Sequence, residues 1–510
     1  MWRKLLNYLK GAIKSKYFYF SLFFLLLNVF LTRDVFAQNG STHIKLLLVL
    51  EVLVELLLVA AILFAKKKKM TVEKLFLVIA IPLGIGFCFL LPLGQAPDEP
   101  AHIFRAYGIS VGDVVTPILE NGEIGSGMPA NLDDMLTWDP TVGTDRMLYS
   151  NIGEPVSNET EFENYGGSAN YNPICYLPQV IGLWISRLFH APVIVSLYMA
   201  RLFNLAAFIV ILFYAIKIAP KFKNFILFFA LTPIALQQGA SFNPDALVIS
   251  TCVFLISYVM YLIYDKKTVM TKKEIALLYV LAIGIGLLKL VYVPLLLMYF
   301  LIPKERFGSS RRKTIHAVIM IMSVAITGIG WFLFSSRYLG DTLEGVNSSG
   351  QVAYILSNPI KYAEVLLRTF QVKFKFYTAS MLGMVLGTLQ ISLPELYVYF
   401  SAGFFLLLLV QNKERLKTKT NERITYLATF VVIMLLMFTV LYLQWSPVGH
   451  PFVEGIQGRY FLPLLLLVPM FLYNPKPKEI YPSTIKTDHI LYYSVFVNVC
   501  ALCCIFAVNF

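Results

Sequence analysis

Apolar stretches of nearly uniform length recur from one end of the sequence to the other. A bilayer core of ~30 Å needs roughly 20 apolar residues in a helix, although packed bundles tolerate shorter or broken ones. The stretches that we expect to cross a membrane are 17–37, 43–65, 73–94, 192–218, 222–238, 245–264, 274–289, 291–303, 313–335, 392–410, 424–445, 459–473 and 489–509. This pattern predicts an all-α polytopic membrane protein with about thirteen transmembrane helices.

The charged residues lie between these stretches. Only 14% of the 510 residues are charged and 57% are hydrophobic, whereas soluble domains carry about a quarter charged residues. The net charge of +13 comes from short Lys and Arg clusters between apolar runs, so we attribute it to membrane topology and exclude a nucleic-acid partner. Of the six cysteines, five lie inside apolar runs and Cys175 stands alone, which indicates neither a disulfide framework nor a zinc site.

One ambiguous run, 172–189, decides the topology. If it lies along the outer surface, every basic cluster can face the cytoplasm, as the positive-inside rule requires. Those clusters are 3–16, 66–69, 217–223, 266–273, 304–313, 413–423 and 476–478. We therefore predict that 172–189 is interfacial, that the N-terminus is cytoplasmic and that the C-terminus is outside. The first segment, which has a basic flank and a VFA-Q ending, also fits a cleaved signal peptide.

This topology divides the chain into three parts. Residues 1–72 form two N-terminal transmembrane helices with basic cytoplasmic ends, 73–473 form the main module, and 474–510 form a cytoplasmic turn and a last helix. The main module has outer loops at 95–191 and 336–391. Between Gln95 and Tyr171 the first loop carries thirteen acidic and two basic residues, and the second contains a basic amphipathic stretch suited to the headgroup zone.

The motif PDEPAHIFRAY follows the third apolar run directly. Asp98 and Glu99 can cap and begin a helix, because carboxylates there satisfy free amides and the helix dipole. In that helix, Asp98, His102 and Arg105 share one face beside the bilayer. A semi-buried carboxylate can also act as general base for a hydroxyl nucleophile. The motif therefore has both a structural and a catalytic interpretation.

Three cations in or at the ends of predicted spans could provide the positive charge that such chemistry needs. Arg201, Lys289 and Arg459 could stabilise the charge on a departing phosphate, or could snorkel to the interface. Asp98, Glu99 and His102 are compatible with a divalent metal, but no second ligand cluster has diagnostic spacing, so we expect no metal and no other cofactor. Nucleotide-binding and hydrolase motifs are absent from the sequence, so an activated substrate must arrive from elsewhere, as a lipid-linked donor does.

Several motifs together resemble the bacterial membrane proteins grouped as domain of unknown function DUF2142. They are PDEPAHIFRAY, NPICYLPQVIGLW, RLFN at 201–204, SFNPDAL at 241–247, Lys289 with Tyr292 and Pro294, SMLGMVLG at 380–387 and GRYFLP at 458–463, over residues 75 to 473. That family is similar in layout to GT-C glycosyltransferases, which have an acidic motif and interfacial helices in the first large outer loop. The chain departs from that layout by its two extra N-terminal spans and by an adjacent Asp-Glu pair in place of two separated aspartates.

The resemblance implies a bacterial cell-membrane enzyme that acts on the extracytoplasmic face. It would be an inverting, metal-independent glycosyltransferase that moves a sugar from a polyprenyl phosphate to a cell-surface polysaccharide or lipid-linked glycan. Asp98 is the implied catalytic base, with Glu99 as second choice. The implied substrate-binding residues are His102, Arg105, Tyr171, Asn172, Arg201, Asn204, Asn243, Asp245, Lys289, Tyr292, Arg459 and Tyr460.

Two alternatives remain open from the sequence. One is a transporter or flippase of a lipid-linked glycan, in which the cations bind substrate without bond chemistry. The other is a non-catalytic partner in cell-wall polymer assembly. The partners expected for the enzyme are membrane lipid, the donor and the glycan acceptor, together with a polyprenyl-phosphate sugar synthase and a flippase.

Overall fold

The fold was obtained as a computed structural model, which describes residues 16–136, 152–264, 269–338, 345–411, 418–472 and 485–510. All the proposed site residues lie in these ranges. The basic residues predicted to face the cytoplasm at 3–15, 266–268, 413–417 and 476–478 lie outside them, as does most of the turn expected after residue 473.

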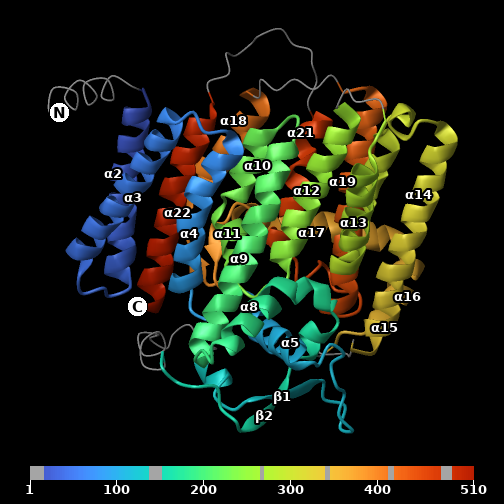
Figure 1. Cartoon of the computed structure of the whole chain (residues 1–510), viewed down its shortest axis with the longest axis horizontal. Coiled ribbons are helices and arrows are strands. Elements are labelled where there is room, and N and C mark those ends of the chain that lie inside the picture. Colours follow the sequence, from blue (N-terminus) through green and yellow to red (C-terminus); the bar gives the residue numbers. More distant parts are fainter. Residues whose placement is uncertain (1–15, 137–151, 265–268, 339–344, 412–417, 473–484) are drawn as a thin grey trace.

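Long apolar helices dominate the described part of the chain, and eight of them are long and apolar enough to cross a membrane. They are α2 (Lys16–Gln38), α3 (Ile44–Lys67), α4 (Val72–Leu90), α9 (Val193–Ile218), α12 (Asp245–Tyr264), the run Ser310–Tyr338, α19 (Thr420–Trp445) and α22 (Thr487–Asn509). They stand side by side in Figure 1. The prediction of an all-α, multi-pass membrane protein is confirmed.

The run Ser310–Tyr338 changes its helix type along its length. It consists of α14 (Ser310–Val324), a π-helical turn η5 (Ala325–Ile329), α15 (Gly330–Ser335) and a 3-10 turn η6 (Ser336–Tyr338). It begins after a short 3-10 helix, η4 (Lys304–Phe307).

The other five predicted spans are short or broken. They correspond to α10 (Lys223–Ala230) with α11 (Pro233–Gly239), α13 (Lys272–Leu288), the 3-10 helix η3 (Leu290–Leu301), α18 (Glu395–Gln411), and η7 (Gly458–Phe461) with α20 (Leu462–Leu465) and α21 (Leu467–Leu472). Prolines explain several interruptions, because proline lacks the N–H that continues a helix. Pro233 starts α11, Pro294 lies inside η3 and Pro463 lies at the start of α20. The count of thirteen spans stays a prediction.

The first loop folds against one end of the helix bundle. It contains α5 (Glu99–Val111), β1 (Gly125–Pro129), η1 (Asp133–Met135), β2 (Thr160–Asn164), α7 (Gly166–Ala169), η2 (Pro173–Tyr176) and α8 (Leu177–Leu188). Strands β1 and β2 are antiparallel, with Gly125 opposite Asn164. Figure 1 places α5, α8 and this hairpin together below the bundle.

Helix α8 forms most of the ambiguous run 172–189, after the short 3-10 helix η2. It has 12 residues, which make a helix of only about 18 Å, too short for a bilayer core. It packs against both α5 and α9. Its length therefore agrees with the interpretation that this run does not span.

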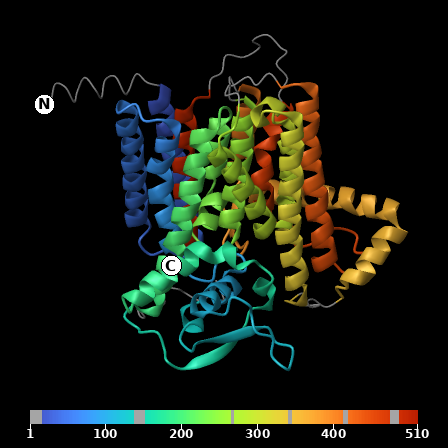
Figure 2. The same ribbon diagram turned by 45° about the vertical axis from the view of Figure 1, so that its right-hand side comes forward.

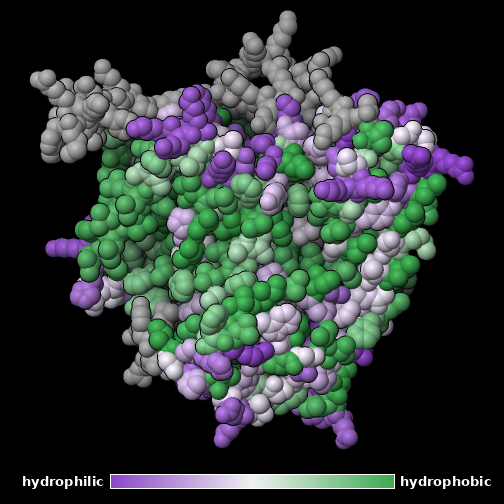
Figure 3. Space-filling view, viewed as in Figure 1, coloured by the Kyte–Doolittle hydropathy of each residue, from purple (hydrophilic) through white to green (hydrophobic). Residues whose placement is uncertain are grey.

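The second loop forms the predicted amphipathic helix. Helices α16 (Ser348–Ser357) and α17 (Pro359–Met381) project sideways from the bundle in Figure 2, and a small hairpin of β3 (Val385–Leu386) and β4 (Ile391–Ser392) follows. Leu367 and Phe374 of α17 are 66% and 64% exposed. Figure 3 shows hydrophobic side chains across the middle of the visible face and hydrophilic ones toward its upper and lower ends.

Candidate functional site

The carboxylate of Glu99, at the start of α5, is buried against a guanidinium from α9. Glu99 Oε2 lies 2.6 Å from Arg201 Nη2, and Arg201 Nε donates a 2.9 Å hydrogen bond to Glu99 Oε1. Both side chains are fully buried. Two parallel contacts match the planar fork of a guanidinium to the two carboxylate oxygens. The pair therefore fixes the start of α5 to the middle of α9.

Backbone N–H groups donate hydrogen bonds to the remaining acceptor positions of the Glu99 carboxylate. The N–H groups of Gly94 and Ala96 donate to Oε2 at 3.0 and 3.2 Å, and that of Phe242 donates to Oε1 at 3.0 Å. Gly94 has a φ of 89°, a left-handed conformation that glycine adopts without strain. With five donors around it, this carboxylate is saturated and has no lone pair free for a substrate.

Arg201 is saturated as well. Its Nη1 donates to the carbonyl groups of Cys88 and Leu91 at 2.9 and 2.6 Å, and its Nη2 donates to that of Pro92 at 2.9 Å. Together with the two bonds to Glu99, these contacts use all five N–H donors of the guanidinium. Arg201, which the sequence predicts as a substrate-binding cation, thus holds the end of α4 and has no donor left for a phosphate.

Next to this pair, four charged side chains of alternating sign form a second group, called here the charged chain. Arg459 Nη2 lies 3.2 Å from Asp98 Oδ2, and Arg459 Nε lies 2.9 Å from Asp245 Oδ2. The other oxygen of Asp245 accepts a 3.2 Å hydrogen bond from Lys289 Nζ. The chain therefore runs Asp98, Arg459, Asp245, Lys289 across four different segments.

Helix ends position the charged chain. Asp245 is the first residue of α12, where the helix dipole favours an anion. Its backbone N–H donates to Asn243 Oδ1 at 2.9 Å, an Asx turn across Pro244 that directly precedes the helix. Lys289 lies between α13 and η3, and Arg459 lies in η7. Because several short helices end here, polar side chains from distant segments meet at one place.

The members of the charged chain differ in accessibility. The side chain of Asp98 is 56% exposed and that of Lys289 is 25% exposed, whereas Asp245 is 5% exposed. Arg459 is 4% exposed, and its Nη1 is buried without a hydrogen-bond partner among the described residues. A buried donor without a partner is costly, so Nη1 can take an additional acceptor. The arrangement offers an exposed carboxylate beside an incompletely used guanidinium.

Asp98 occupies the N-cap position of α5, as the structural interpretation of the motif requires. Its side chain makes no capping hydrogen bond, however, and its φ of 60° lies in the left-handed region. Such a backbone is uncommon for residues other than glycine, with Asp and Asn among those that tolerate it best. The carboxylate is therefore directed to Arg459 and the surface instead of the helix amides.

Two tyrosines complete the wall beside Lys289. The Tyr460 ring centroid lies 4.4 Å from Lys289 Nζ, a cation–π contact. The Tyr460 hydroxyl accepts a 3.4 Å hydrogen bond from Arg459 Nη2, and the Tyr292 hydroxyl donates to the Tyr460 carbonyl at 2.8 Å. The structure thus brings these two predicted residues to the charged chain.

His102 lies behind Asp98, away from water. Its Nδ1 lies 2.8 Å from the hydroxyl of Tyr176, and its ring meets that of Tyr171 edge-on with centroids 5.4 Å apart. Burial, with a smaller effect of Arg459, lowers the pKa of His102 to about 4 against the opposing effect of Asp98. The imidazole is therefore neutral near pH 7. Tyr176 was missed as a site residue, although the NPICYLP motif contains it.

Two predicted binding residues serve the local fold of the first loop. Arg105 donates from Nη1 and Nη2 to the carbonyl groups of Asp113 and Val114, both at 3.0 Å, and so holds the segment that follows α5 against that helix. Asn172 Oδ1 accepts from the N–H of Ile174 at 3.0 Å and caps η2. Neither side chain belongs to the charged chain.

The other two predicted asparagines, Asn204 of α9 and Asn243, bond to backbone carbonyl groups next to the site. Asn204 Nδ2 donates to the Ser241 carbonyl at 2.7 Å, and Asn243 Nδ2 donates to the Pro97 carbonyl at 3.1 Å. They hold the 241–245 turn beside the acidic motif, so their contacts position Asp98 and Asp245.

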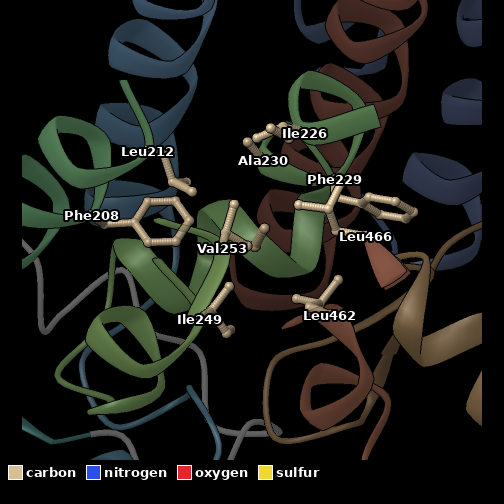
Figure 4. Close-up of a pocket in the computed structure, with 10 residues that line it drawn as sticks. Phe208, Leu212, Ile226, Phe229, Ala230, Ile249, Val253, Leu462 and Leu466 are labelled. Carbon is tan, nitrogen blue, oxygen red and sulfur yellow. The ribbon is translucent and has the colours of Figure 1, made fainter. Parts of the chain in front are cut away.

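An apolar pocket opens deeper in the bundle, between α9, α10, α12 and α20 (Figure 4). Ile249 and Val253 line it, one and two helical turns along α12 from Asp245. Leu462 lines it as well, three residues after Arg459. The pocket therefore lies close to the charged chain along α12 and along the segment formed by η7 and α20. Its residues were not singled out from the sequence, because apolar residues in an apolar run carry no distinguishing signal.

Among the described residues no three His, Cys, Asp or Glu side chains come together as a group that could hold a metal ion. All six cysteines are free thiols.

A family model described as "Predicted membrane protein (DUF2142)" matches residues 81–468. No curated protein and no solved structure matches the chain. The matched region begins inside α4 and contains every residue of the charged chain, whereas α2, α3 and α22 lie outside it.

Proposed function

The chain belongs to the DUF2142 family of predicted membrane proteins, and we propose that it is a GT-C-type glycosyltransferase. It would transfer a sugar from a polyprenyl-phosphate donor to a cell-surface polysaccharide or lipid-linked glycan. The observation that carries the proposal is the contact of the exposed Asp98 carboxylate with Arg459, whose Nη1 donor is unused. A base and a phosphate-binding cation are the two groups that such a transfer needs.

The base role suits Asp98 better than Glu99. A general base must reach the hydroxyl proton of its substrate, and Asp98 is 56% exposed. Glu99 is fully buried and accepts five hydrogen bonds from the chain itself. We assign Glu99 and Arg201 to holding the acidic loop in place.

The phosphate would bind between Arg459 and Lys289. Arg459 Nη1 is free to donate, and a phosphate oxygen can also replace Asp98 on Nη2. This exchange releases the Asp98 carboxylate to accept a proton when the donor is bound. The acceptor oxygen then forms a bond to the anomeric carbon, its proton passes to Asp98, and the bond from that carbon to the phosphate oxygen breaks. The two cations stabilise the phosphate that leaves.

Apolar side chains next to the charged chain suit a lipid-linked donor. Leu462 and Ile249 follow Arg459 and Asp245 by about one helical turn and line a cavity of only about 10 Å³, so a prenyl chain would enter the bundle only after these side chains move apart. The proposal includes the expected topology of about thirteen spans and an extracytoplasmic site. It implies a polyprenyl-phosphate sugar synthase and a flippase as suppliers of the donor.

The test uses the purified full chain in lipid vesicles with a polyprenyl-phosphate sugar and an acceptor glycan. A transferase releases polyprenyl phosphate and glycosylates the acceptor, and the Asp98→Asn variant does neither. Transport of the donor across the vesicle membrane without release of polyprenyl phosphate would establish a flippase instead. If both reactions fail while Asp98, Lys289 and Arg459 can be replaced without changing the surface glycan of the cell, the proposal is wrong.

A further inference from the structure

Helix α3, outside the family match, carries two acidic residues in a hydrophobic span. Glu51 and Glu55 are one helical turn apart, and they are 3% and 0% exposed. Ionisable residues inside a membrane span are rare because charge is poorly solvated there, and they usually mark a proton or ion site. The charged chain does not involve them, so they call for a separate explanation.

The contacts of Thr32 identify the protonation state of Glu51. The Thr32 hydroxyl lies 2.7 Å from the Asn28 carbonyl oxygen and 2.6 Å from Glu51 Oε2. A hydroxyl has one proton to donate, and a carbonyl oxygen can only accept. Thr32 donates its proton to the carbonyl oxygen of Asn28, one helical turn earlier. The short contact between Thr32 and Glu51 is then a hydrogen bond only if Glu51 Oε2 carries a proton and donates it to the Thr32 hydroxyl oxygen.

Asn28 fixes the second carboxyl group. Its Nδ2 donates to Glu55 Oε1 and, at 2.8 Å, to the carbonyl oxygen of Phe496, while its Oδ1 accepts from the Tyr397 hydroxyl. Glu55 Oε1 is thus an acceptor. The network joins α2 and α3 to α18, which lies in the family region, and to α22, which does not.

In the described part of the chain, no cation balances the two carboxyl groups. Among the described residues, the ion pairs include neither Glu51 nor Glu55, and one oxygen of each, Oε1 and Oε2 respectively, is buried without a hydrogen-bond partner. The other titratable groups that interact with the pair or with its immediate neighbours are of types that carry no positive charge. They are Tyr397 of α18, and Tyr493, Cys500, Cys503 and Cys504 of α22. Helices α2 and α4 also pack on α3, but none of their described titratable groups acts on the pair; Arg33 and Asp34, which follow Thr32 on α2, are exposed. Two adjacent carboxylates in such surroundings cannot both be ionised.

We propose that Glu51 and Glu55 form a proton-binding site inside the membrane, with the proton on Glu51 Oε2 where it donates to Thr32. The unpartnered oxygens, Glu51 Oε1 and Glu55 Oε2, leave room for a second proton. The bound proton removes the repulsion between two negatively charged carboxylates, so α2 and α3 can pack on α18 and α22. As the pH rises and the proton leaves, uncompensated negative charge weakens this packing.

Infrared spectroscopy of the purified full chain in lipid tests the site directly. Glu51→Gln replaces an acid O–H donor by an amide N–H donor of nearly the same shape, so we expect the variant to fold. The spectrum of the wild type minus that of Glu51→Gln at neutral pH should contain the carbonyl band of a protonated carboxyl group, shifted in D2O. A difference spectrum with carboxylate bands alone would overturn the proposal. Glu123→Gln, an exposed acid of the first loop, serves as the matched control and should give carboxylate bands.

Two further variants keep the test decisive if Glu51→Gln does not fold. Thr32→Val removes the acceptor of the Glu51 proton, so the protonated-carboxyl band should move to higher frequency; an unmoved band contradicts the assignment. The double variant Glu51→Gln/Glu55→Gln should keep its melting temperature as the pH rises from neutral to alkaline, while that of the wild type falls. Parallel pH curves for the two proteins would mean that no proton is bound at this pair.

Discussion

Asp98 Oδ2 and Arg459 Nη2 lie 3.2 Å apart, although 361 residues separate them in the chain. The contact connects the acidic motif after α4 with the GRYFLP motif before α20. Both residues have other interactions as well: Asp98 is exposed to solvent, and Arg459 also contacts Asp245. This accessible pair is the feature on which the proposed chemistry depends.

We expect Asp98→Asn to lower transferase activity by about 10²- to 10⁴-fold, the usual contribution of a general base. Asparagine tolerates the left-handed backbone at this position, so the fold should persist. Release of polyprenyl phosphate by purified protein measures the effect. Glu120→Gln, an exposed acid in the same loop, is the control and should leave the rate unchanged. Near-normal turnover by a folded Asp98→Asn protein would contradict the base role.

Arg201→Met should prevent stable folding. Removal of one partner from a buried ion pair leaves an uncompensated charge and costs about 3–5 kcal/mol. Thermal unfolding and size-exclusion chromatography in detergent measure the loss. The double variant Glu99→Gln/Arg201→Met, which leaves no charge behind, should recover part of the stability. If Arg201→Met folded normally but did not bind donor, Arg201 would be a substrate ligand after all.

Arg459→Lys tests the use of a guanidinium for phosphate. Lysine keeps the positive charge but lacks the planar set of donors, so the free Nη1 position is lost. Hydrogen bonds to charged groups are worth about 1.5–3 kcal/mol, so we expect the KM for the donor to rise roughly 10- to 100-fold. The control is Lys373→Gln, which removes the partner of Glu454 from α17. An unchanged KM in Arg459→Lys would place the phosphate elsewhere.

Gly458→Ala should displace Arg459. A Cβ at position 458 would overlap the backbone nitrogen of Met381 and Ser380 Oγ, and the Gly458 N–H bonds to that oxygen at 3.1 Å. Backbone cannot move aside as a flexible side chain can, so η7 must shift. Activity should fall by at least tenfold in protein that still inserts into membranes. Gly284→Ala, where the added Cβ meets nothing within 4 Å, should keep its activity.

His102 should make the protein less stable in acid. Burial lowers the pKa of His102 from its ordinary 6.5 to about 4, so between these values the unfolded chain binds more protons than the folded protein. The neutral, buried His102 contributes about 3 kcal/mol to the free energy of unfolding. This contribution is complete above pH 6.5 and is lost as the pH falls toward 4. Unfolding followed across this range should show a smaller pH dependence in His102→Asn. The variant His190→Gln, at an exposed histidine, should behave like the wild type.

Much of the architecture follows from local sequence. Runs such as 44–67 and 487–509 are helices because their hydrophobic length suits a bilayer, and 99–111 is a helix because Glu99 and Pro100 suit its first turn. Whether an apolar run forms one continuous helix was harder to predict. The apolar run at 222–238 breaks at Pro233, so its hydrophobicity alone did not show two short helices.

The sequence by itself determined that the chain is a membrane helix bundle with an acidic motif and several cations near helix ends. Only the tertiary structure decided which carboxylate serves which purpose. Asp98 and Glu99 are chemically alike and adjacent, yet Glu99 is enclosed by Arg201 and backbone amides while Asp98 contacts Arg459. The physical reason is that hydrophobic length and helix starts depend on neighbouring residues, whereas a charged side chain takes its partner from segments a hundred or more residues away, which packing alone brings near.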